Sequence, residues 1–136
     1  MLRKRGDGLV FALLGLAAVI AILWGCGQPY SPPEQQARVP AAVIAALGEM
    51  DARGLADWAS YGRSVAGRIT YGGEMPGFDA YADYAAQRIY VGDAWLAMTG
   101  ADRGEVLLEE LWHLRTRIMS HPPELDEPLE VYCKEA

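Results

Sequence analysis

The 136-residue sequence has few of the features that define several common classes of protein. Two cysteines are too few for a disulfide-stabilised scaffold, and 12 Lys and Arg against 18 Asp and Glu give a formal net charge of −6. This acidic balance argues against nucleic acid as the main partner, because phosphate binding requires clustered basic side chains. With 51% hydrophobic and 22% charged residues, the chain is neither a disordered acidic tail nor a multi-pass membrane protein.

The hydrophobic residues are concentrated near the N-terminus, where a basic head precedes a long apolar run. Arg3, Lys4 and Arg5 come before an uninterrupted run from Leu9 to Gly25. This arrangement is typical of an export signal or a membrane anchor, and the basic residues hold the N-terminus on the inside. We therefore expect the rest of the chain to be exported and held at the cell membrane or envelope.

The end of this run resembles the signal of bacterial lipoproteins. Leu23-Trp24-Gly25-Cys26 has an aliphatic residue three positions before the cysteine and a small residue directly before it. The resemblance implies cleavage before Cys26 and lipidation of its thiol. The alternative is an uncleaved single-pass anchor with Trp24 at the membrane interface, where indole rings gather. Either arrangement tethers the remaining chain to the membrane.

After the signal or anchor over 1–26, the sequence predicts a linker over 27–38 and one domain over 39–136. The linker has three prolines within 27–37 and no hydrophobic periodicity, as is typical of a tether. Helical spacing of hydrophobic residues begins at Val39, and Pro40 suits a first helical turn. The domain that follows is large enough to build a core of its own.

Helical and strand patterns are mixed along this domain, which predicts an α+β fold. The strongest helical periodicity runs over 101–120, with Asp102 as its N-cap. The best strand follows a short connection and forms a hairpin with the preceding strand. We expect a helix, a small antiparallel sheet, a long helix and a C-terminal helix. The expected helices span 39–50, 101–120 and 126–134, and the expected strands span 68–71, 80–84 and 88–91.

One side of the predicted long helix carries a pattern of metal-ligand type. Glu109-Glu110-Leu111-Trp112-His113 resembles the HExxH active-site helix of zincin metallopeptidases, with Glu109 in place of the first histidine. A spacing of four residues brings Glu109 and His113 together from adjacent helical turns. The resemblance implies that these two side chains bind zinc and that Glu110 is the general base acting on metal-activated water.

The resemblance extends to neighbouring segments and implies a minimal zincin-like domain. In that family, an edge strand beside the active-site helix holds the peptide substrate in extended form, and Ile89, Tyr90 and Val91 take this place here. A carboxylate on a following helix supplies the third ligand in the glutamate-type branch, and Glu130 is the candidate. His121 is not expected to contribute, because its spacing does not fit the metzincin pattern.

Two functions of different classes follow from these patterns. The first is a membrane-tethered, exported peptidase that hydrolyses peptide bonds with metal-activated water. The second is a non-catalytic envelope lipoprotein or single-pass protein that acts as a binding module. Charged side chains opposite a hydrophobic arc are also what an ordinary surface helix shows, which keeps the second function open. Binding of zinc separates the two, whether the partner is a peptide substrate or an envelope protein.

Overall fold

The computed structural model describes residues 30–133, and all the elements below belong to one compact unit, Ser31–Ala136. The predicted signal or anchor over 1–26, including Cys26, and the first residues of the predicted linker lie outside the described residues. Within the described part of the chain, we find no helix that is both long enough and apolar enough to cross a membrane.

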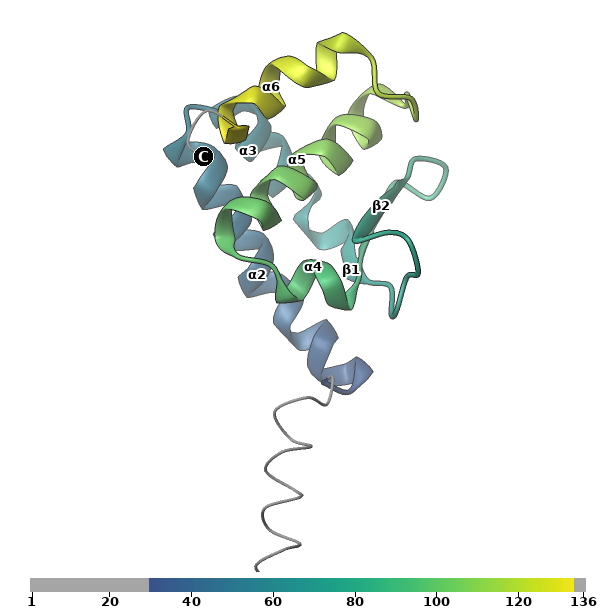
Figure 1. The fold of residues 1–136 in the computed structure, drawn as a ribbon. Coiled ribbons are helices and arrows are strands. Elements are labelled where there is room, and N and C mark those ends of the chain that lie inside the picture. Colours follow the sequence, from purple (N-terminus) through teal and green to yellow (C-terminus); the bar gives the residue numbers. More distant parts are fainter. Residues whose placement is uncertain (1–29, 134–136) are drawn as a thin grey trace, which may run out of the picture. The chain divides into compact units, whose positions relative to one another are not determined.

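Helices and three short strands follow one another along this unit (Figure 1). The sheet has the strand order β1-β3-β2, in which β3 is parallel to β1 and antiparallel to β2. The predicted α+β class is confirmed, but the sheet is mixed, because the hairpin partner of β2 lies between β2 and β1. The helical elements are α2 (Pro32–Ala52), α3 (Ala56–Val65), η1 (Ala66–Arg68, a 3-10 helix), α4 (Asp93–Ala97), α5 (Gly100–Thr116) and α6 (Pro123–Cys133), and the strands are β1 (Ile69–Tyr71), β2 (Ala80–Asp83) and β3 (Arg88–Val91).

Helix α2 begins at Pro32, well before the predicted start of the domain. Ser31 precedes the helix in an extended conformation, and its backbone N–H donates to Oε2 of Glu34 at 2.7 Å. Prolines at the first helical positions are also favourable, because an N–H group has no helical partner there. The second half of the predicted linker is therefore helical, and Pro40 lies inside α2 instead of in its first turn.

Helix α5 and the hairpin lie close to where the sequence predicts them. The N-cap of α5 is Thr99, and Asp102 lies within the first turn. The helix ends at Thr116, earlier than predicted, because Arg117 adopts a left-handed conformation with φ of 59°. A left-handed residue at this position ends a helix and turns the chain away from its axis. The segment after Arg117 is therefore free to return along α5.

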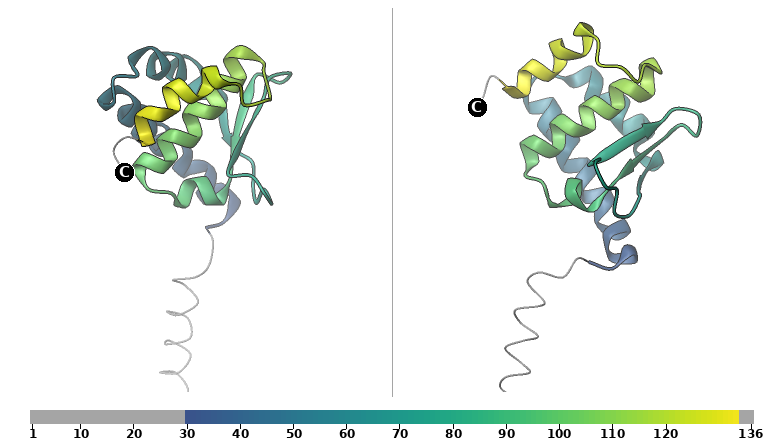
Figure 2. Two further views of the ribbon diagram at one scale, coloured as in Figure 1. Left: turned by 45° about the horizontal axis from the view of Figure 1, so that its top comes forward. Right: turned by 45° about the vertical axis from the view of Figure 1, so that its right-hand side comes forward.

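The hydrophobic core fixes α5 between α2 and the sheet. α2 packs against α5, α3 and β1, and α5 packs against β2 and α6. Both views in Figure 2 place the strands along one flank of the helices. Burial of a large hydrophobic side chain contributes about 1.5–3 kcal/mol, so this core holds α5 and β2 at a fixed separation. Among the core side chains with no exposed surface are Met50, Ile89, Trp95, Leu107 and Leu111.

Candidate metal centre

The polar side of α5 is largely buried. His113 is 3% exposed and Glu110 is 9% exposed, whereas Glu109 is half-buried. Strand β2 packs against α5, and the segment after Arg117 returns to contact His113. Burying polar or charged groups costs free energy unless they are hydrogen-bonded or paired. The interpretation of this side as an ordinary solvated helix face is therefore wrong for Glu110 and His113.

The imidazole of His113 is held in one orientation by the returning segment. Its Nδ1 lies 2.5 Å from the carbonyl oxygen of Ile118. A carbonyl oxygen accepts only, so Nδ1 carries a proton, and in the neutral tautomer that this bond requires Nε2 has a lone pair. The Nε2 atom lies 3.8 Å from Oε1 of Glu109. A hydrogen bond from the second ring nitrogen to a carbonyl is the usual support of a metal-binding histidine.

His121 joins this pair, which corrects the expectation from its spacing. Its Nε2 lies 3.1 Å from Oε1 of Glu109, and its ring centroid is 5.1 Å from that of His113. The physical reason is the left-handed turn at Arg117, which ends α5 and sends the chain back toward the polar side of the helix. The residue spacing of the metzincin motif does not apply to a side chain that such a turn brings back to the helix.

Glu109, His113 and His121 fit the donor set of a metal ion. Each offers one ligand atom, and these atoms all lie within 4.8 Å of one another. Two imidazoles and one carboxylate are the protein ligands of several catalytic zinc sites. Ligand atoms on one tetrahedral zinc ion are about 3.3 Å apart, given bonds of about 2.0–2.2 Å. Small inward movements of the Glu109 carboxylate and of the exposed His121 ring would meet this requirement.

Glu130, the predicted third ligand, is not part of this cluster. The metal-ligating group found among residues 30–133 contains His121 instead, and Glu130 is exposed on α6. The chain passes the polar side of α5 at His121, before α6 begins at Pro123. Glu130 lies seven residues further, about 10 Å along the α6 axis. The ligand therefore comes from the connection between the helices.

Glu110 is a buried acid beside the cluster. Burial and the neighbouring carboxylate of Glu109 raise the pKa of Glu110 to about 8, although the backbone N–H of Ala82 donates to it and acts in the opposite direction. In the protein without a bound cation, this carboxyl group is therefore mostly protonated near neutral pH. A nearby cation favours the ionised form of an acid. The protonation of Glu110 is thus coupled to the charge of the adjacent cluster.

Strand β3 is not the edge strand, which corrects the position predicted for Ile89, Tyr90 and Val91. These residues pair with β1 on one side and with β2 on the other, and Ile89 and Val91 have no exposed surface. The backbone groups of β3 are already used in the sheet. Tyr90 is half-buried and its ring stacks on Tyr81 of β2, with centroids 5.1 Å apart. A peptide cannot add to this strand by main-chain pairing.

The free edge next to α5 belongs to β2. The N–H of Gly92 donates to the carbonyl of Asp79 at 2.9 Å, which fixes the alternation of hydrogen-bonded pairs between β2 and β3. In an antiparallel pair, every second residue directs its N–H and C=O away from the partner. Ala80 and Ala82 occupy these positions, so their backbone groups point away from β3, although both residues are almost fully buried. Glu110 receives its hydrogen bond from this edge.

Sequence reasoning missed His121 and the outward-facing backbone of β2. The signal for His121 was its scarcity, because the chain has only two histidines and both follow Glu109 within one helix and its connection. The sequence does not indicate the order of the strands in the sheet, because that order depends on where β1 lies. His121 thus replaces Glu130 as the third candidate ligand, and β2 replaces β3 as the strand beside the site.

No protein-family model, curated protein sequence or solved structure matches this chain. The resemblance to zincins expected from the sequence therefore stays a prediction, which rests on the residues of α5. Its strongest elements are the Glu109–His113 spacing and the buried Glu110. Its main departure is the third ligand, which comes from the connection after α5.

Proposed function

We propose that this chain is a membrane-tethered, exported, zinc-dependent peptidase with a minimal zincin-like domain. The observation that carries the proposal is the convergence of Glu109, His113 and His121 within 4.8 Å, next to the buried acid Glu110. A zinc ion held there would act as a Lewis acid on water and on the scissile carbonyl group. The tether is proposed from the basic head and apolar run at the N-terminus, with Cys26 as the lipidation site.

The three ligands have different degrees of freedom. His113 is buried and fixed by its hydrogen bond to Ile118, so its Nε2 presents a lone pair in one direction. Glu109 is half-buried, and the side chain of His121 is 59% exposed. We assign His113 the role of the fixed ligand, and Glu109 and His121 the roles of ligands that close on the ion.

Glu110 is assigned the role of the general base. It must lose its proton to act, and its raised pKa shows how strongly burial opposes this in the absence of a cation. The positive charge of a bound ion favours the carboxylate, which can then take a proton from water and give it to the leaving amine. A base with this environment is active only when the neighbouring site is loaded.

The outward edge of β2 is assigned the role of the substrate guide. The N–H and C=O groups of Ala80 and the C=O of Ala82 point away from β3, but Ala80 and Ala82 are only 5% and 3% exposed, so an extended peptide would have to displace what covers this edge in order to pair with it. Peptides commonly bind by adding a strand to such an edge, with main-chain hydrogen bonds supplying affinity. The N–H of Ala82 already contacts Glu110, which supports a position of the reacting peptide bond close to the base.

The proposal is tested by zinc titration and by peptide hydrolysis with the purified chain in detergent. We expect calorimetry to show uptake of about one zinc ion per chain, and His121→Ala to weaken binding by about 10–100-fold. We expect Glu110→Gln to keep the ion and to lose hydrolysis of an unstructured peptide. Absence of zinc uptake would leave the binding module as the function. Equal turnover by the wild type and Glu110→Gln would remove Glu110 from its assigned role.

A further inference from the structure

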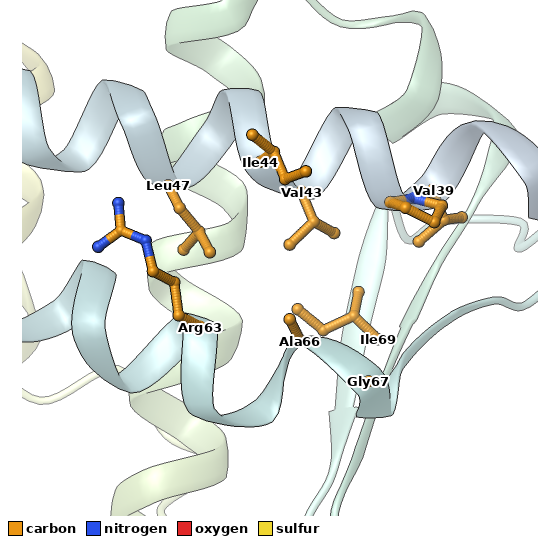
Figure 3. Close-up of a pocket in the computed structure, with 9 residues that line it drawn as sticks. Val39, Val43, Ile44, Leu47, Arg63, Ala66, Gly67 and Ile69 are labelled. Carbon is orange, nitrogen blue, oxygen red and sulfur yellow. The ribbon is translucent and has the colours of Figure 1, made fainter.

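A second site lies away from the metal cluster, in a cleft between α2 and the end of α3. Val39, Val43, Ile44 and Leu47 of α2 face Ala66 and Ile69 across this cleft (Figure 3). It has a volume of about 410 Å³, within the range of small-molecule sites. The remaining lining residues are Pro40, Arg63 and Gly67.

The lining of this cleft offers almost no hydrogen-bonding side chains. Arg63 is its single charged residue, and the guanidinium of Arg63 already forms an ion pair with Asp51. A polar ligand would lose its bonds to water without gaining partners, which costs free energy. A hydrocarbon ligand has no such cost, and gains from burial against aliphatic walls. The chemistry of the cleft therefore selects an aliphatic chain.

The mouth of the cleft carries one strongly exposed hydrophobic side chain. Ile44 is 71% exposed, more than any other large hydrophobic side chain among residues 30–133. Val39, Val43 and Leu47 beneath it are almost fully buried. Ile44 and the aliphatic lining beneath it therefore give the cleft an apolar opening, which a hydrophobic ligand would cover.

The position of the cleft along the chain favours a membrane lipid over a protein as its partner. Val39 lies seven residues after the start of α2, which is about 10 Å along the helix. The residues from Cys26 to Ser31 span at most about 20 Å when fully extended. A tether ending at Gly25 would therefore allow Val39 to lie no further than about 30 Å from the bilayer surface.

We propose that the cleft between α2 and η1 binds the acyl chain of a bilayer lipid, so that the domain is held against the membrane as well as tethered to it. The inference concerns a site separate from the metal cluster and does not depend on peptidase activity. It rests on the proposed membrane tether, and the experiment below reports on that tether separately.

The test uses the full, unprocessed chain, in which residues 1–25 have not been cleaved off, in phosphatidylcholine–phosphatidylglycerol vesicles that contain a phosphatidylcholine with a diazirine in one acyl chain. After illumination, the lipid attaches covalently to residues beside it, and mass spectrometry locates the attachment. We expect labelling of residues 39–47 and 66–69 in addition to the apolar run over 9–25. Labelling of 9–25 is the internal control, because it reports the tether alone.

Gly67→Leu is the variant that places a large aliphatic side chain at the wall of the cleft. A Cβ at Gly67 meets nothing within 4 Å, so the larger side chain extends into free space. We expect labelling of the cleft to fall about tenfold while labelling of 9–25 stays constant. Gly48→Leu is the matched control, because Gly48 is exposed on α2, outside the cleft, and also has free space at its Cβ position. Ile44→Glu gives the same test at the exposed mouth if Gly67→Leu alters the fold.

Three results would overturn the proposal. The first is labelling of 9–25 without labelling of the cleft, which would leave the tether intact. The second is labelling of neither region, which would remove the tether and this inference together while leaving zinc binding untouched. The third is a dimer in sedimentation that Ile44→Glu converts to a monomer, since the cleft would then be an interface between two copies.

Discussion

Helices α5 and α6 both carry an acidic side in the sequence, but these two sides differ in burial in the folded structure. On α5, Glu110 is 9% exposed and His113 is 3% exposed. On α6, Glu127 and Glu130 are exposed to solvent. The edge of β2 and the segment after Arg117 contact the polar side of α5 and enclose it. Spacing along a helix decides which side chains share a side, and the neighbouring segments decide whether they meet in a site.

The largest effect that separates the two helices is expected from His113→Asn. The amide nitrogen of asparagine takes the place of Nδ1 and keeps the hydrogen bond to the carbonyl of Ile118, but nothing replaces Nε2 as a ligand. We expect zinc affinity to fall by about a thousandfold or more, measured by calorimetry. Glu130→Gln on α6 is the control and should bind zinc as the wild type does. Equal loss of affinity in both variants would place the ligand set on both helices.

A second effect concerns stability and pH in the metal-free protein. The folded state raises the pKa of Glu110 to about 8 from 4.5, so between these values it holds a proton that the unfolded chain releases. The free energy of unfolding should therefore decrease as pH rises from about 4.5 to about 8, by up to the order of 4 kcal/mol.

Urea unfolding at several pH values in the presence of a chelator measures this dependence. Glu110→Gln removes the titrating group and keeps an acceptor for the N–H of Ala82, so its stability should depend much less on pH. Glu127→Gln on the exposed side of α6 should keep the slope of the wild type. A Glu110→Gln protein with the same slope as the wild type would show that Glu110 is not the acid responsible.

The smallest effect is expected at the turn that encloses the site. Arg117 has φ of 59°, a conformation that costs an L-residue about 1–2 kcal/mol and that glycine adopts freely. Arg117→Gly should therefore raise the free energy of unfolding by about 0.5–1 kcal/mol, after the greater entropy of glycine in the unfolded chain is counted. Arg117→Val should lower it, because a β-branched residue fits this conformation poorly. Urea unfolding gives both values, and a stabilising Arg117→Val would contradict the assigned turn.

The sequence predicted three of the helices, the hairpin and two of the three candidate ligands, but it did not predict α3 or α4. Regular hydrophobic spacing placed α5 and the hairpin, and the four-residue spacing of Glu109 and His113 placed two ligand atoms on one side of a helix. These properties depend on residues close together in the chain. They require no knowledge of how distant elements pack.

The remaining features depend on long-range packing or on single turns, which periodicity does not record. The left-handed conformation of Arg117 brings His121 to Glu109, and no glycine or asparagine at that position signals it. The placement of β3 between β1 and β2 depends on the whole sheet, and it moved the free edge from the predicted strand to its neighbour. The start of α2 at Pro32 was missed because a proline-rich segment also resembles a linker.

All three candidate ligands lie between positions 109 and 121, and this local arrangement has a consequence for folding. An ion bound there would link one helix to the connection that directly follows it and would not link elements that are distant in the chain. Zinc would therefore order the turn after α5 more than it would hold the rest of the domain together. The hydrophobic packing of α2, α5 and the sheet has to supply the cooperativity of folding, with or without the ion.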